Sequence, residues 1–148
     1  NYDAKQKLID LIEKPLWTAT GKTAPDTLIP DLISISGSQF VIFDAKYYNT
    51  RLEAGCIPSG QPGIESVTKQ YLYQLAYQKF IAEHGFEKVK NCFLMPTEKD
   101  HIIKCGEVSL PILSTIGLQD IKVRFLPASM VYNYYLLGKK IDINLLEL

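Results

Sequence analysis

The pattern of apolar and polar positions predicts three helices along the chain. Residues 4–14 (AKQKLIDLIEK) carry apolar side chains at helical spacing, and Pro15 stops this segment. Residues 64–84 continue the same spacing over a longer stretch, and Gly85 is placed to end that helix as its C′ glycine. A tyrosine-rich helix is expected at 129–137.

Strand patterns fill the segments between these helices. Residues 31–36 (DLISIS) are β-branched and half polar, and residues 39–48 (QFVIFDAKYY) are longer and more apolar. Gly37 and Ser38 alone separate them, and a glycine at the first central position suits the type II′ turn of a hairpin. Further strands are expected at 89–95, 101–110 and 120–126.

The order of these elements predicts the fold class. A helix, a hairpin, a second helix and then mixed strands and a last helix indicate an α/β protein, with a central mixed sheet flanked by helices. Residues 18–30 and 50–63 are rich in Gly, Pro or Thr and are expected to be irregular connections. The 148 residues fit one domain, and the start at Asn1 favours the C-terminal part of a longer protein.

Composition narrows the function classes. The 16 basic and 16 acidic residues cancel, so the chain is not a strongly basic nucleic-acid-binding domain. A net charge of zero does not argue against an active site for phosphodiesters, because such a site itself carries carboxylates. No apolar run reaches the roughly 20 residues of a membrane span, and no membrane partner is expected. Three cysteines without a CxxC motif indicate reduced core thiols and a cytoplasmic protein.

The two-residue turn also fixes the register of the hairpin, and with it the candidate chemistry. If Ser36 pairs with Gln39, then Asp31 faces Asp44 directly across the two strands. Facing side chains lie about 4.5–5.5 Å apart at Cβ, and like charges at that distance destabilise a sheet. A cation between the two carboxylates removes the repulsion, and oxygen ligands of this kind suit Mg²⁺.

Lys46 adds a cation on the same face of the strand, two residues after Asp44. An ammonium beside a bound metal can orient or deprotonate an attacking water and neutralise phosphate. The alternative interpretation is a simple salt bridge between Lys46 and an acid at the sheet edge. The Pro30-Asp31 step and the paired register favour the first interpretation.

These residues resemble a known superfamily of nucleases. The stretch IPDLISISGSQFVIFDAKYY is similar to the PD-(D/E)XK core, with Pro30-Asp31 as the PD and Asp44-Ala45-Lys46 as the (D/E)XK. The resemblance implies that Asp31 and Asp44 bind the metal, with the Ala45 carbonyl as a third ligand. It implies that Lys46 is the catalytic lysine.

The DAKYY ending and the following helix, KQYLYQLAYQKF, are similar to the LlaJI and McrC branch of restriction and modification-dependent endonucleases. The resemblance covers roughly residues 4–85. It implies a restriction-endonuclease-like core in which a catalytic β-hairpin belongs to a central mixed sheet flanked by helices.

The helix after this core often carries a glutamine in a Q-x-x-x-Y pattern, from which this sequence departs. Gln70 is followed by Gln74 at the fourth position, so either could serve the site, and simple solvation is the alternative for both. Gln70, beside Lys69, is the preferred catalytic candidate. Relatives also place an acid on the first helix, where Glu13 is a candidate metal ligand and a solvated carboxylate is the alternative.

The sequence therefore predicts a metal-dependent DNA endonuclease domain, the cleavage module of a restriction system, using Mg²⁺ with Mn²⁺ as a substitute. DNA recognition is expected elsewhere, in a nucleotide-hydrolysing subunit or a further N-terminal domain. The alternative is an inactive scaffold or interaction module with the same fold. The candidate DNA contacts are Lys22, Arg51, Lys69 and Gln74.

Overall fold

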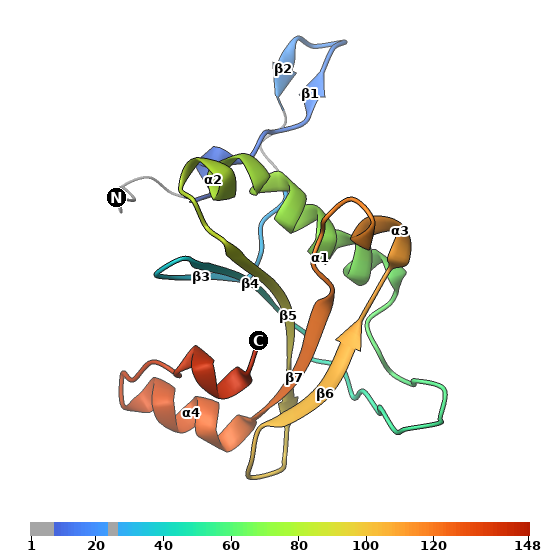
Figure 1. Cartoon of the computed structure of the whole chain (residues 1–148), viewed down its shortest axis with the longest axis vertical. Helices are drawn as coiled ribbons and strands as arrows, with labels where there is room; N and C mark the ends of the chain where they lie inside the picture. Colours follow the sequence, from blue (N-terminus) through green and yellow to red (C-terminus); the bar gives the residue numbers. More distant parts are fainter. Residues whose placement is uncertain (1–7, 24–26) are drawn as a thin grey trace.

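A five-stranded mixed sheet forms the centre of the protein (Figure 1). The computed structural model describes residues 8–23 and 27–148. The strand order is β3-β4-β5-β7-β6; β4, β5 and β7 run parallel, and the edge strands β3 and β6 run antiparallel to their neighbours. The strands are β3 Leu32–Ser36, β4 Gln39–Ala45, β5 Lys88–Thr97, β6 Ile103–Val108 and β7 Ile121–Pro127. The mixed α/β class expected from the sequence is confirmed.

The three parallel strands are buried because both of their faces are covered. In β4 the four residues from Phe40 to Phe43 are at most 2% exposed, whereas β3 has no buried residue. The apolar run of β4 therefore belongs to the inside of the sheet, and the half-polar run of β3 belongs to its edge.

Two consecutive helices, α1 (Ile64–Ala76) and α2 (Gln78–Glu83), cover one face of the sheet. Their buried aromatic side chains pack against Phe40 and Ile42 of β4. One continuous helix was expected over 64–84; the backbone departs from helical geometry at Tyr77, although the hydrogen bond from Tyr77 N to Tyr73 O continues across the join at 3.1 Å. The predicted end is confirmed, since Gly85 has a φ of +67°.

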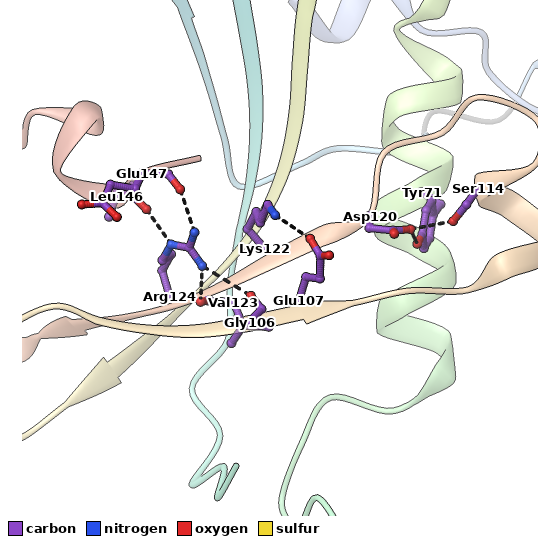
Figure 2. Close-up of polar contacts among 10 residues, drawn as sticks. All are labelled: Tyr71, Gly106, Glu107, Ser114, Asp120, Lys122, Val123, Arg124, Leu146 and Glu147. Carbon is purple, nitrogen blue, oxygen red and sulfur yellow. Dashed lines mark hydrogen bonds and ion pairs between the residues drawn. The ribbon is translucent and has the colours of Figure 1, made fainter. Parts of the chain in front are cut away.

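The opposite face is covered by the C-terminal segment, comprising α4 (Ala128–Leu136) and the 3₁₀ helix η2 (Ile143–Leu146). Arg124 of β7 holds this segment (Figure 2): its guanidinium donates to the carbonyl oxygens of Leu146 at 2.6 Å and Glu147 at 2.8 Å. Leu146 packs into a buried cluster with Val41 and Phe43. The Arg124 side chain thus ties the end of the chain to the sheet.

A second polar anchor fixes α1 to the loops at the other end of the sheet. The Tyr71 hydroxyl donates to Asp120 Oδ1 at 2.8 Å and accepts from the Leu110 amide at 3.0 Å. Ser114, at the end of the short helix α3 (Pro111–Ser114), donates to the same Asp120 oxygen at 2.5 Å (Figure 2).

The N-terminal region differs most from expectation. The helix predicted over 4–14 is a short 3₁₀ helix, η1 (Leu8–Leu11), and residues 4–7 lie outside the described residues. The connection expected to be irregular contains a two-stranded antiparallel pair, β1 (Leu16–Trp17) with β2 (Lys22–Thr23). Figure 1 shows this pair projecting from the body of the protein. Among the described residues, no helix is long and apolar enough to cross a bilayer.

The two cations of β7 allow the C-terminal anchor to be tested. Arg124→Met leaves buried carbonyl oxygens without their charged donor, so the free energy of unfolding should fall by about 2–4 kcal/mol. Lys122→Met breaks only the part-exposed ion pair with Glu107, at 2.5 Å, and should cost less than about 1 kcal/mol. Urea denaturation of both variants measures the difference; equal losses would show that Arg124 does not anchor the C-terminal segment.

Candidate active site

The hairpin has the register that the two-residue turn predicts. Ser36 pairs with Gln39, and the ladder continues to Leu32 opposite Phe43. Gly37 occupies the first central position of the turn with a φ of +55°, a conformation that a glycine adopts without steric cost. The next pair beyond the ladder brings Asp31 opposite Asp44.

The Asp31 and Asp44 side chains meet at the open end of this hairpin. Asp31 directly precedes β3, and its Oδ2 accepts a hydrogen bond from the Ala45 amide at 2.8 Å. Asp44 is the penultimate residue of β4 and is 4% exposed. Burial raises the pKa of the Asp44 carboxyl most, and a hydrogen bond and the charge of Asp31 raise it further, so the two acids interact.

Lys46 completes this group of three charges. Its Nζ lies 2.5 Å from Asp44 Oδ2, and 5.8 Å from the centre of the Phe93 ring. The Lys46 amide donates to the Leu94 carbonyl at 2.8 Å, so the parallel pairing with β5 continues past the end of β4 and holds the lysine backbone in place. The salt bridge of the alternative interpretation is present, but Asp44 also interacts with a second acid, Asp31.

The balance of charges leaves Asp44 unfavourable as an anion. Burial is the largest effect and raises the pKa of Asp44; Lys46 lowers it, and Asp31 raises it again. The buried Asp44 Oδ2 is paired with the Lys46 ammonium. Two carboxylates thus share one ammonium, so the ionised site carries an excess of negative charge.

Helix α1 forms the wall beside the two acids. Burial and the charges of Asp44 and Asp31 raise the pKa of Tyr73 to about 12. The exposed Lys69 has its Nζ 5.9 Å from the centre of the Tyr73 ring. Tyr73 was missed from the sequence, although its position one turn after Lys69 on the same helix would have suggested it.

The two candidate glutamines are both buried, so the alternative of simple solvation is wrong for each. Gln70 Nε2 donates to the Ile42 carbonyl at 3.0 Å, two residues before Asp44 on the same strand. Gln74 Oε1 instead accepts from Asn91 at 2.9 Å and from the Gln119 amide at 2.8 Å. The structure therefore brings Gln70, and not Gln74, to the strand of the site, and burial removes Gln74 from the candidate DNA contacts.

The remaining predicted residues lie away from the acid pair. Glu13 is exposed beyond the end of η1, its carbonyl accepts from the Thr27 hydroxyl at 2.8 Å, and it is not among the groups that shift the pKa of Asp44. Its predicted role as a metal ligand is not supported by this position. Lys22 is exposed on the projecting strand β2, and Arg51 is exposed in the 50–63 loop, where its backbone pairs with Ser59.

Other side chains add no metal ligands. Within residues 8–23 and 27–148, no three His, Cys, Asp or Glu side chains come close enough to share an ion. The cysteines are unpaired: Cys92 is buried, with its pKa raised to about 12 by desolvation, but Cys56 is exposed, contrary to the expectation of core thiols alone. A metal at this site would thus be held by two carboxylates and backbone or solvent oxygens.

Comparison with known proteins gives a family. The family model of the LlaJI restriction endonuclease matches residues 2–128. The chain belongs to the LlaJI restriction endonuclease family. It is also 35% identical over 119 residues to the type II restriction enzyme BsuMI component YdjA of Bacillus subtilis (strain 168), a match that covers 76% of this chain. The match spans 24% of that relative's length. No solved structure matches the chain.

The raised pKa of Asp44 predicts a pH-dependent effect of Asp44→Asn on the metal-free protein. The folded protein binds this proton more tightly than the unfolded chain, whose pKa is near 3.8. Ionised Asp44 therefore costs stability at neutral pH, and the cost disappears as the pH falls through the folded-state pKa and below 3.8. The variant should equal or exceed the wild type at pH 7, by up to about 1 kcal/mol, and lose that advantage in acid.

Urea unfolding in a chelator across a pH series measures this difference. Asp100→Asn is the control, because the pKa of Asp100 is lowered by its hydrogen bond to His101 and its removal should give no gain at neutral pH. A clear loss of stability in Asp44→Asn at pH 7 would mean that the ion pair with Lys46 outweighs the burial of Asp44.

Proposed function

We propose that this chain is the metal-dependent cleavage module of a restriction system and hydrolyses phosphodiester bonds in DNA. The observation that carries the proposal is the meeting of Asp31, Asp44 and Lys46 at the open end of one hairpin. Membership of the LlaJI restriction endonuclease family supports the substrate class and the restriction-system role.

The residues at the hairpin fit a hard divalent cation. Asp44 presents a buried carboxylate oxygen whose close partner is the Lys46 ammonium, and Asp31 presents a second carboxylate beside it. The Ala45 carbonyl, between Asp44 and Lys46, is a third oxygen ligand of the kind that Mg²⁺ accepts. We therefore assign Mg²⁺, with Mn²⁺ as a substitute, to Asp31, Asp44 and the Ala45 carbonyl.

Each residue of the group has a distinct task. When bound, a divalent cation lowers the pKa of water and stabilises negative charge on a phosphate. Asp31 and Asp44 would hold the cation at the end of β4. The hydrogen bond from the Ala45 amide keeps the Asp31 carboxylate turned toward the site. Lys46 turns from its ion pair with Asp44 to the scissile phosphate, where it neutralises an oxygen and orients the attacking water. Gln70 donates a hydrogen bond to the Ile42 carbonyl and so supports the strand that carries Asp44.

DNA recognition is supplied by other parts of the assembly. The net charge of the chain is zero, and Lys69, over the Tyr73 ring, is the candidate DNA contact on helix α1. The Bacillus subtilis relative is described as a component of a restriction enzyme, and this chain matches a quarter of its length. We therefore place sequence recognition in a nucleotide-hydrolysing subunit or in a further domain, acting on DNA in the cytoplasm.

Substitution at Asp44 and Lys46 separates the metal ligand from the catalytic lysine. Asp44→Ala removes a ligand and should abolish both cleavage and Mn²⁺ binding, with an affinity loss above about 100-fold, since even groups that only support ligands cost 10- to 100-fold. Lys46→Ala should reduce cleavage by at least about 100-fold while Mn²⁺ affinity stays equal or rises, because a neighbouring cation is gone.

Calorimetry with Mn²⁺ and a DNA cleavage assay of the full-length assembly distinguish the two variants. Asp100→Ala, at an exposed loop acid, is the matched control and should behave as wild type in both measurements. Normal cleavage by Lys46→Ala would contradict the proposal and favour an inactive scaffold in which the lysine only forms a salt bridge.

Binding of duplex DNA by the isolated domain should be weak and strongly dependent on salt. The affinity comes from phosphate contacts, so its logarithm should fall linearly with the logarithm of salt concentration. Lys69→Ala should reduce that slope by about 1, and Lys22 and Arg51 should each contribute similarly. Lys79→Ala, on α2 and paired with Glu83 at 3.9 Å, is the control. Tight, sequence-selective binding would show that recognition resides in this chain.

A further inference from the structure

A cluster of three buried amide side chains joins α1 to the sheet directly beneath the acid pair. Gln70 and Asn91 are fully buried, and Gln74 is 8% exposed. A buried amide is costly unless it is hydrogen-bonded, whereas an apolar contact at the same place would leave the helix free to adopt several positions. The cluster therefore fixes one position of α1 on the sheet.

Asn91 of β5 is the central residue of this cluster. Its Nδ2 donates to Gln74 Oε1 and to the Gln119 carbonyl, both at 2.9 Å. Its Oδ1 faces Gln70 Nε2 at 3.5 Å. One side chain thus contacts two positions on α1, one turn apart, and the loop that leads into β7.

Gln70 connects this cluster to the strand of the site. Its Nε2 also donates to the Ile42 carbonyl at 3.0 Å, and Ile42 is the residue that pairs with Asn91 between β4 and β5. Asp44 follows two residues later on the same face of β4. Gln70 Nε2 therefore donates to two acceptors, whereas Gln70 Oε1 is buried without a hydrogen-bond partner.

We propose that Asn91 is a positioning residue of the acidic site: it sets the orientation of the Gln70 amide, and through Gln70 it holds the Ile42–Asp44 end of β4 against α1. The Ile42 carbonyl and Asn91 Oδ1 are both acceptors, so both favour the orientation that leaves Gln70 Oε1 unpaired. This inference rests on the proposed nuclease function, because it assigns a role in that site.

The test compares variants of the full-length protein in three measurements: thermal stability, Mn²⁺ affinity by calorimetry, and kcat and KM for a DNA that the wild type cleaves. Asn91→Leu removes all three contacts at similar volume, and Gln70→Leu removes the link to β4. Tyr71→Phe is the matched control, because it breaks a buried polar anchor at the next position of the same helix without touching β4.

We expect Asn91→Leu to lose stability, to bind Mn²⁺ about 10-fold more weakly and to lower kcat by about 10- to 100-fold, as for other residues that orient metal ligands. KM for DNA should change little. Tyr71→Phe should lose stability alone. The double variant Asn91→Leu/Gln70→Leu should be no worse in kcat than Gln70→Leu, since Asn91 acts on β4 only through Gln70.

Two results would overturn this inference and leave the proposed nuclease function standing. One is wild-type Mn²⁺ affinity and kcat in Asn91→Leu, or in the smaller Asn91→Ser if the leucine variant does not fold. The other is additive losses of kcat in the double variant. A wild-type protein that neither binds Mn²⁺ nor cleaves DNA would overturn the proposed function and this inference with it.

Discussion

The close approach of Asp31 and Asp44 across one β-hairpin is the constraint on which the rest of the site depends. Two like charges at adjacent strand positions weaken a sheet, and the burial of Asp44 adds a further cost. The hairpin nevertheless holds its register to Leu32, the residue that follows Asp31. The fold must therefore stabilise β4 by interactions that do not involve the acids.

Those interactions surround β4 on every side. Its apolar residues pack into one cluster under α1 and another under the C-terminal segment, and its backbone pairs with β3 and β5. Arg124 ties the C-terminal segment to the sheet on one face, and the amide cluster around Asn91 fixes α1 on the other. The acids occupy the end of a strand that is held from both faces, so the fold can keep two neighbouring carboxylates despite their repulsion.

Local sequence signals predicted the hairpin and the residues at its open end. Gly37 at the turn set the register, and alternation along the strand placed Asp44 and Lys46 on one face. The helical segment over 64–84 and its end at Gly85 could also be predicted, because apolar spacing and a C′ glycine are local features of the sequence. Within the described residues, the α-helix predicted over 4–14 is only the 3₁₀ helix η1, although Ile12 just after it packs into the buried cluster under α1 and α2.

The buried polar residues could not be predicted in the same way. Asn91 directly precedes the apolar stretch 92–95 of β5, and its partners lie on a helix and a loop distant in sequence. Gln70 and Gln74 show that two residues one turn apart can have different tasks, which only the position of α1 on the sheet decides. Glu13 was expected at the site because a relative's acid often lies on the first helix, but here that segment ends early and the side chain is exposed.

The measurement that tests the central claim most directly is a crystal structure of the protein soaked with Mn²⁺, with the ion located by its anomalous scattering. The account predicts one ion bound by carboxylate oxygens of both Asp31 and Asp44 and by the Ala45 carbonyl, with Lys46 Nζ moved away from Asp44 Oδ2. An ion bound elsewhere, or an acid pair that stays with Lys46 and takes no ion at saturating Mn²⁺, would contradict it.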